Sequence, residues 1–292
     1  MFLLQIESAA GDGRETVGGS AADKADILCE NILGLSLPPR SYNNIDYISA
    51  AGQGEAYRKD SARTITALVD VFRSQKGYDN LLKLLHGDVW LKFDLNGKKR
   101  KIKAKLLSVS DPKRGVDMNS VVVQWVCDNP YFRDWENTSA NAFGRFDHIG
   151  EDEGMFSLPM VFTSRVTEAA LINEGYFPVE PIVHISVQKR LGASGGSGGI
   201  VLENITTGET VSFDYPLSAD TDKITVNVPE RIVVSKELGV ITNLLSADSF
   251  LHRFVLEPGL NELKVTNLNT NYHTTATVEY CHRYVECEYT KE

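Results

Sequence analysis

Short runs of β-branched and aromatic residues recur along most of the chain, separated by glycine, asparagine, aspartate and proline. Thr64–Phe72 is typical: Ile65, Ala67, Val69 and Val71 occupy alternate positions. A period of two predicts a β-strand with one buried face. Because this pattern recurs in both halves of the sequence, we expect a mostly β protein.

A β-hairpin is predicted at Asn96-Gly97, since both residues accept the positive φ angles of a two-residue turn. The strand Val89–Asp94 precedes the turn. In the returning strand, Ile102–Leu106 places apolar residues on one face and lysines on the other. A further strand, Met118–Cys127, ends before a proline, which cannot donate to a β-ladder.

One short α-helix is predicted over Tyr78–Leu85, where apolar residues follow the i, i+3, i+4, i+7 pattern. Asp79 suits the positive end of the helix dipole, and Gly87 stands where a helix stop is expected. A helix of this length must pack against a sheet to persist.

Three segments break the strand pattern. Ala9–Lys24 is rich in small and polar residues and is expected to be a mobile loop. Tyr47–Arg63 is expected to be a polar, bent excursion. Leu191–Gly199 is expected to be a glycine-rich loop between two strands.

Residues 136–154 lack an apolar pattern and are interpreted as a linker. Short strands separated by turn residues follow this linker, which is typical of a β-sandwich. The expected strands are Met160–Thr163, Ala169–Ile172, Ile182–Val187, Ile200–Glu203, Thr210–Phe213, Lys223–Val228, Arg231–Val234, Phe250–Leu256, Asn261–Thr266 and Thr274–Tyr280.

The charge distribution also divides the chain. Up to Asp134 there are 19 Lys/Arg and 17 Asp/Glu, a net of +2, whereas the remainder has 11 and 22, a net of −11. With 292 residues, the chain is long enough for two cores. We therefore expect domains at 1–135 and 155–292. The acidic second domain argues against nucleic-acid binding there.

Several stretches resemble the distal tail proteins of long-tailed, non-contractile phages (siphophages). In the first half they are GQGEAY (Gly52–Tyr57), RTIT (Arg63–Thr66), YDNLLKLL (Tyr78–Leu85) and VVVQWVCDNPYF (Val121–Phe132). In the second half they are INEGYFPVEP (Ile172–Pro181), NITTGET (Asn204–Thr210) and LEPGLNEL (Leu256–Leu263). Their order and spacing carry the resemblance, and they span nearly the whole sequence.

This resemblance implies a hexameric ring formed by the N-terminal domains and a galectin-like C-terminal sandwich. The ring would join the tail tube protein to the tail-associated or tail-tip protein, and the outer domain could hold a receptor-binding protein. Such a baseplate component would belong to the virion, after assembly in the bacterial cytoplasm. It would neither insert into a membrane nor bind specific nucleic-acid sequences.

The excursion at Tyr47–Arg63 is the best candidate for an arm between subunits, because rings need two different adhesive faces on one domain. Its candidate contact residues are Gly52, Gly54, Tyr57, Arg58 and Lys59. An ordinary surface loop is the alternative.

Candidate catalytic and metal motifs are weak. Gly195–Gly199 matches G-x-S-x-G around Ser197, but a nucleophile elbow needs a following helix, and a strand is expected there. Asp220-Thr221-Asp222 lacks the later ligands of an EF-hand and is interpreted as a turn. The six histidines show no metal-binding spacing. We therefore predict no enzyme activity, and no catalytic, cofactor-binding or metal-binding residue.

The basic run Lys98–Lys105 is interpreted as a solvated strand edge, because no interleaved aromatics are evident in the sequence. A basic contact to a partner protein is the alternative.

The alternative function is a carbohydrate-binding or host-adhesion module that uses the second domain. That domain has no tryptophan, so tyrosines would have to supply the aromatic platform. The candidates are Tyr176, Tyr215, Tyr272, Tyr280 and Tyr284.

The four cysteines form no CxxC pair and are expected to be free thiols. Cys281 and Cys287 could share one face of a strand. Met1–Ile6 is too short for a signal-peptide core, and no run is long enough for a membrane helix.

Overall fold

The computed structural model divides into two compact units, each described here by itself. Unit 1 comprises Met1–Trp135 and Arg283–Glu292, and unit 2 comprises Glu136–His282. The structure describes residues 2–10, 14–18, 27–46, 53–72, 79, 81–83, 85–95, 97–115, 118–136, 138–145, 168–189, 196–217, 221–269 and 272–287.

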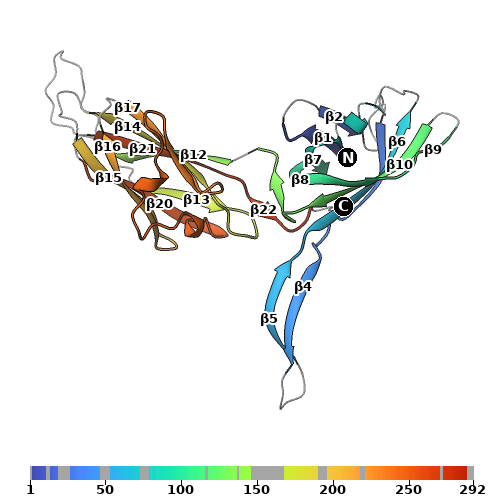
Figure 1. Cartoon of the computed structure of the whole chain (residues 1–292), viewed down its shortest axis with the longest axis horizontal. Helices are drawn as coiled ribbons and strands as arrows, with labels where there is room; N and C mark the ends of the chain where they lie inside the picture. Colours follow the sequence, from blue (N-terminus) through green and yellow to red (C-terminus); the bar gives the residue numbers. More distant parts are fainter. Residues whose placement is uncertain are drawn as a thin grey trace. The chain divides into compact units, whose positions relative to one another are not determined.

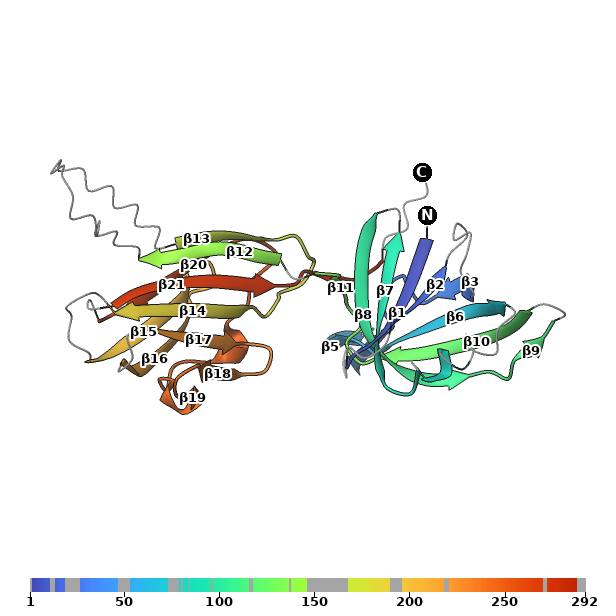
Figure 2. The same cartoon turned by 90° about the horizontal axis from the view of Figure 1, so that it is seen from above.

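Unit 1 is built on a sheet that closes on itself (Figures 1 and 2). Its hydrogen-bonded order is β22-β11-β8-β7-β1-β2-β3-β6-β10-β9, and β8 also pairs with β10. The strands from β8 through β10 therefore form a closed barrel, which leaves few free edges. The strands are β1 Phe2–Ser8, β2 Arg14–Gly18, β3 Ile27–Leu33, β6 Arg63–Phe72, β7 Asp88–Leu95, β8 Lys98–Val109, β9 Lys113–Arg114, β10 Met118–Cys127, β11 Phe132–Asp134 and β22 Arg283–Tyr284.

The barrel interior is filled by the apolar positions that alternate in the sequence. In β7, Val89, Leu91, Phe93 and Leu95 are all buried. The hairpin predicted at Asn96-Gly97 is confirmed by its pairing: β7 runs antiparallel to β8, from Asp88 opposite Lys105 to Leu95 opposite Lys98. Gly97 has φ +87°, the conformation for which glycine suits this turn.

The helix predicted over Tyr78–Leu85 is confirmed in its described part, where residues 79, 81–83 and 85 have helical backbone. Leu81 and Leu85 belong to the buried cluster of the barrel. The short helix is therefore held by apolar packing, as its length requires.

Unit 2 contains two antiparallel sheets around one apolar core. The six-stranded sheet has the order β12-β21-β14-β17-β18-β19, and the four-stranded sheet has the order β13-β20-β15-β16. Their bounds are β12 Thr138–Arg145, β13 Glu168–Asn173, β14 Ile182–Lys189, β15 Gly196–Asn204, β16 Glu209–Leu217, β17 Thr221–Asn227, β18 Ile232–Ser235, β19 Gly239–Val240, β20 Gly259–Asn267 and β21 Tyr272–Tyr280.

The compact units differ from the expected domain division in two places. Thr138–Arg145 was expected within the linker, but it forms β12, which pairs with β21. Residues 283–292 were expected in the second domain, but they belong to unit 1, where β22 pairs with β11. Pairing with distant strands is invisible to a local hydrophobic pattern, which explains both differences. Of the rest of the expected linker, Glu136 is described, whereas 137 and 146–154 lie outside the described residues.

Other local expectations need correction. Arg14–Gly18, expected in a loop, pairs with β1 as β2. β15 begins at Gly196, inside the expected glycine-rich loop, and pairs with β16. Phe250–Leu256 was expected to be a strand but contains the 3-10 helix Leu251–Arg253. The strand expected at Met160–Thr163 lies outside the described residues.

Candidate assembly surfaces

A two-stranded arm extends away from the barrel of unit 1 (Figure 1). It consists of β4, Arg40–Asp46, and β5, Gln53–Asp60, which pair with each other and join no other sheet. An ion pair of 3.0 Å between Arg40 Nε and Asp60 Oδ1 closes the hairpin at its root. The excursion expected in this region is therefore an ordered β-hairpin over its described residues, and it begins earlier than expected.

Four of the five predicted arm residues lie in β5. Gly54 is opposite Ile45, and Tyr57 and Arg58 are opposite Asn43 and Tyr42. The fourth, Lys59, is exposed and stands opposite Ser41. Gly52 lies outside the described residues. Whether these residues contact a neighbour remains a prediction.

A buried arginine holds the root of the arm. Arg63, the first residue of β6, is only 1% exposed, and its guanidinium lies 4.5 Å above the centre of the Phe132 ring. It donates to four backbone carbonyls: Gly34 at 2.7 Å, Ser36 at 2.5 Å, Pro130 at 2.9 Å and Val285 at 2.5 Å. Burial lowers its pKa to about 10, which keeps it protonated at neutral pH. Arg63 therefore ties together the segment that enters the arm, the end of β10 and the C-terminal return.

One outer face of the barrel carries many charges that pair among themselves. On β1, β7 and β8, Lys92 Nζ lies 2.6 Å from Glu7 Oε2, and Lys103 Nζ lies 3.0 Å from Asp88 Oδ2. Lys105 Nζ bonds to Asp128 Oδ2 at 2.7 Å. This ion-paired face agrees with a solvated role for the basic run, because three of its cations, Arg100, Lys103 and Lys105, have carboxylate partners.

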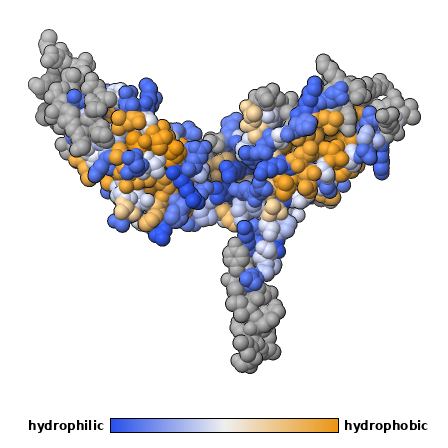
Figure 3. Space-filling view, in the orientation of Figure 1, coloured by the Kyte–Doolittle hydropathy of each residue, from blue (hydrophilic) through white to orange (hydrophobic). Residues whose placement is uncertain are grey.

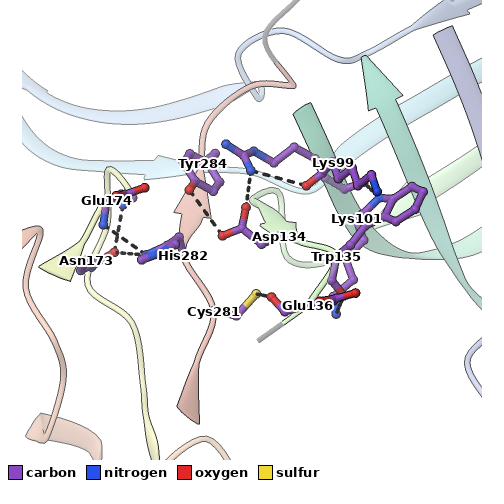
Figure 4. Close-up of polar contacts among 12 residues, drawn as sticks. Lys99, Lys101, Asp134, Trp135, Glu136, Asn173, Glu174, Cys281, His282 and Tyr284 are labelled. Carbon is purple, nitrogen blue, oxygen red and sulfur yellow. Dashed lines mark hydrogen bonds and ion pairs between the residues drawn. The ribbon is translucent and has the colours of Figure 1, made fainter. Parts of the chain in front are cut away.

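Aromatic rings do interleave with these cations, contrary to the expectation from sequence. The Trp135 ring lies 5.3 Å from Lys99 Nζ, and Trp135 Nε1 donates to the Arg100 carbonyl. The Arg100 guanidinium stacks on Tyr284 and pairs with Asp134. The Tyr284 hydroxyl also donates to Asp134 (Figure 4). Trp135 and Tyr284 are far from the lysines in sequence, so only the fold brings them together. Arg100 is engaged by these neighbours, which makes a nucleic-acid platform a poor interpretation.

A second outer face of the barrel has an uncharged centre, which is bordered by Lys105 opposite Val126 and by Asp70 opposite Ser120. It is formed where β3, β6 and β10 adjoin the end of β8, and Leu33 is 62% exposed at one side of it. Register places its members in rows, for example Leu33 beside Thr66 and Thr66 beside Gln124. In Figure 3, hydrophobic colour covers the part of unit 1 where Figure 1 draws β8 and β10. We define the uncharged face as Asn31, Leu33, Thr64, Thr66, Leu68, Ser108, Ser110, Val122, Gln124 and Val126.

Unit 2 offers little aromatic surface. Among its candidate tyrosines, Tyr215, Tyr272 and Tyr280 are buried, whereas Tyr176 is 55% exposed. Tyr284, the fifth candidate, belongs to unit 1. Tyr176 is therefore the exposed one of the candidate tyrosines in unit 2, where Phe250 is also 42% exposed.

The weak catalytic and metal motifs have structural roles. Ser197 lies within β15, opposite Pro216, and the chain continues as a strand rather than a helix. Asp222 was expected in a turn but lies in β17, where it accepts from Ser235 Oγ at 2.6 Å and from the Glu237 amide at 3.2 Å. In the described part of the chain, no three His, Cys, Asp or Glu side chains gather as a metal site.

The cysteines are free, and three of them are buried in unit 1. Burial raises the pKa of Cys29 to about 11 and the pKa of Cys127 and Cys287 to about 12. The half-buried Cys281 lies in unit 2. Cys281 and Cys287 therefore do not share a strand face, because one follows β21 and the other packs in the barrel core. No helix in the described segments is long and apolar enough to span a bilayer.

The fold defines the structural class: it is shared with a protein of a phage adsorption hub and with chains of a phage baseplate. The SPP1 Dit (gp 19.1) protein, described as a paradigm of the hub adsorption apparatus in phages infecting Gram-positive bacteria, matches with a TM-score of 0.67 at 14% identity. The match covers 97% of this chain and 99% of that chain.

Chains of the phage P2 baseplate in its activated conformation also match. The calcium form gives a TM-score of 0.57 at 11% identity over 97% of this chain and 98% of that chain. The strontium form gives 0.55 at 11% identity over 95% and 98%. No protein-family model and no curated protein matches the sequence.

Proposed function

We propose that this chain is a structural distal tail protein of a long-tailed phage or prophage, located at the tail tip of the virion. The observation that carries this proposal is the fold similarity to SPP1 Dit over 97% of the chain. Fold alone does not define function. Two further features support a structural role: the surfaces of unit 1 suit protein assembly, and Ser197 and Asp222, from the weak catalytic and metal motifs, lie within β-strands.

In this proposal, unit 1 forms a hexameric ring and unit 2 is a galectin-like outer domain. Because the contacts of a cyclic ring are heterologous, each copy needs two different adhesive surfaces. The arm supplies one of them, with Gly52, Gly54, Tyr57, Arg58 and Lys59 as contact residues. The ring would join the tail tube protein to the tail-tip protein, and unit 2 would hold a receptor-binding protein.

A carbohydrate-binding or host-adhesion module is the second candidate. It rests on the exposed Tyr176, since an accessible aromatic ring can stack on the apolar face of a sugar. This candidate predicts saturable glycan binding by a monomer, whereas the tail proposal predicts self-association.

Light scattering after size exclusion, at several protein concentrations, tests the main proposal. We expect a species of six times the 32.3 kDa chain mass, seen as a ring in negative stain. A monomer at every concentration would contradict a self-assembling ring, and a glycan screen would then decide for or against the second candidate.

A further inference from the structure

We propose that the β4–β5 arm of one copy binds the uncharged face of a second copy's barrel. This inference rests on the proposed ring, and it specifies which two surfaces meet. The receptor is the face on β3, β6, β8 and β10, and its occupant is the hairpin formed by Arg40–Asp46 and Gln53–Asp60.

The uncharged face is suited to burial. Its ten members include no acidic or basic residue, although the other outer face of the same barrel holds the pairs of Glu7, Asp88 and Lys92. Leu68 and Val122 lie directly opposite each other at its centre, and both are partly exposed. Covering this face removes apolar surface from water without stripping the hydration from a charge.

The arm needs a partner surface. An isolated two-stranded hairpin is marginally stable in water, and three strands or packing against another element are normally required. Among the strands that the structure describes, β4 and β5 pair only with each other, and the exposed Tyr42 on β4 lies outside both apolar cores. A hairpin that extends from its own barrel is therefore best explained by packing on another molecule.

The neutral part of the arm suits the uncharged face. The arm as a whole has six charged residues, Arg40, Asp46, Glu55, Arg58, Lys59 and Asp60. Arg40 and Asp60 pair with each other at the root, and the neutral positions, which include Asn43–Ile45, Gly54 and Tyr57, can pack on the uncharged face. The contact is also heterologous, arm against barrel, and a repeated heterologous contact generates a ring when its rotation closes.

Two variants of the full chain separate the surfaces. In the first, Asn-Gly replaces residues 41–59; Arg40 and Asp60 are paired neighbours, so a two-residue turn can join them. In the second, Leu33→Lys and Gln124→Lys place two charges on the uncharged face. We expect each variant alone to be monomeric by light scattering. Mixed together they should form a 1:1 dimer, because one retains an intact face and the other an intact arm.

The matched control is Leu268→Lys with Gln188→Lys, which adds the same charges at exposed positions of unit 2. Leu268 is 66% exposed, compared with 62% for Leu33. The control should retain the wild-type mass. The thermal unfolding of every variant, followed by circular dichroism, shows whether it is folded.

The possible outcomes are distinguishable. If the wild type forms rings and the face variant does so too, the arm-on-face contact is wrong while the ring proposal stands. If both variants are monomeric and their mixture stays monomeric, the contact is again wrong, since both intact surfaces are present. A wild type that never associates overturns the ring and this contact together.

Discussion

The two units stabilise their buried polar groups differently. Among the described residues of unit 1, the buried cation Arg63 bonds to carbonyls as far away in sequence as Val285. Among the buried polar residues of unit 2 are three neutral amides, Asn173, Asn204 and Asn261, whose side chains bond to backbone 83, 51 and 4 residues away. A cation loses far more hydration on burial than an amide does, so it depends more strongly on its partners. Removing the Arg63 guanidinium is therefore expected to cost more stability than removing any one of these three amides.

The position of the tryptophans makes this contrast measurable. Trp90, Trp125 and Trp135 are the three tryptophans of the chain, and all of them lie in unit 1. Tryptophan fluorescence therefore reports on unit 1 alone, whereas far-UV circular dichroism reports on both units.

Replacing the buried cation should have the largest effect. Arg63→Met leaves the carbonyls of Gly34, Ser36, Pro130 and Val285 without this donor. A buried acceptor left without a hydrogen bond costs about 1–3 kcal/mol, and four carbonyls lose this donor. We expect the unfolding free energy measured by tryptophan fluorescence in urea to fall by about 3 kcal/mol or more.

Arg63→Lys is the control for this change, because it keeps the charge but cannot reproduce the fork of donors. It should fall between the wild type and Arg63→Met. Equal stability of all three proteins would mean that the hydrogen bonds of Arg63 contribute nothing to the free energy of unfolding. The contrast between the two units would then be wrong.

The strands of unit 1 could be predicted from the sequence, but the burial of Arg63 could not. The β7–β8 hairpin follows from Asn96-Gly97 and from strict alternation, both of which are local. Arg63 sits before an apolar strand and looks like an ordinary charged residue at a strand end. Its burial depends on Pro130 and Val285, which lie 67 and 222 residues away.

The candidate surfaces show the same limit. The alternating lysines of β8 are plain in the sequence, and their solvated role was inferred from them. The uncharged face was not foreseen, because its members come from four separate segments. Strand register alone places Leu33, Thr66 and Gln124 side by side. Uncharged residues at the outward positions of several predicted strands indicate such a face, but the sequence does not show which strands adjoin.

Alkaline pH should weaken unit 1 selectively. Cys29, Cys127 and Cys287 have a pKa of about 11 to 12 in the folded barrel, against 9.0 for an unperturbed thiol. Their contribution to stability is complete below pH 9, where unfolded thiols are also protonated, and is lost as the pH rises toward the folded values. Between about pH 8 and about pH 9.5, we expect the three thiols to lower the free energy of unfolding by roughly 2 kcal/mol in total.

Urea titrations at the two pH values, read by tryptophan fluorescence, measure this loss. Cys127→Ala provides the control, since it removes one ionisable thiol and should reduce the pH dependence by about one third, whatever its effect on stability at pH 8. An unchanged pH dependence in this variant would show that Cys127 does not titrate as its burial predicts.

The smallest effect is expected from a single amide in unit 2. Asn204 Nδ2 donates to the Val255 carbonyl at 2.7 Å, and Asn204 Oδ1 accepts from the amides of Thr206 and Thr207. Asn204→Ala removes these bonds but leaves no buried charge behind, so a loss of about 1–2 kcal/mol is expected. Circular dichroism should record the loss while the tryptophan transition of unit 1 stays in place. A shift of both transitions by the same amount would mean that the two units unfold as one. The buried Arg63 of unit 1 and the buried amides of unit 2 would then stabilise a single cooperative structure.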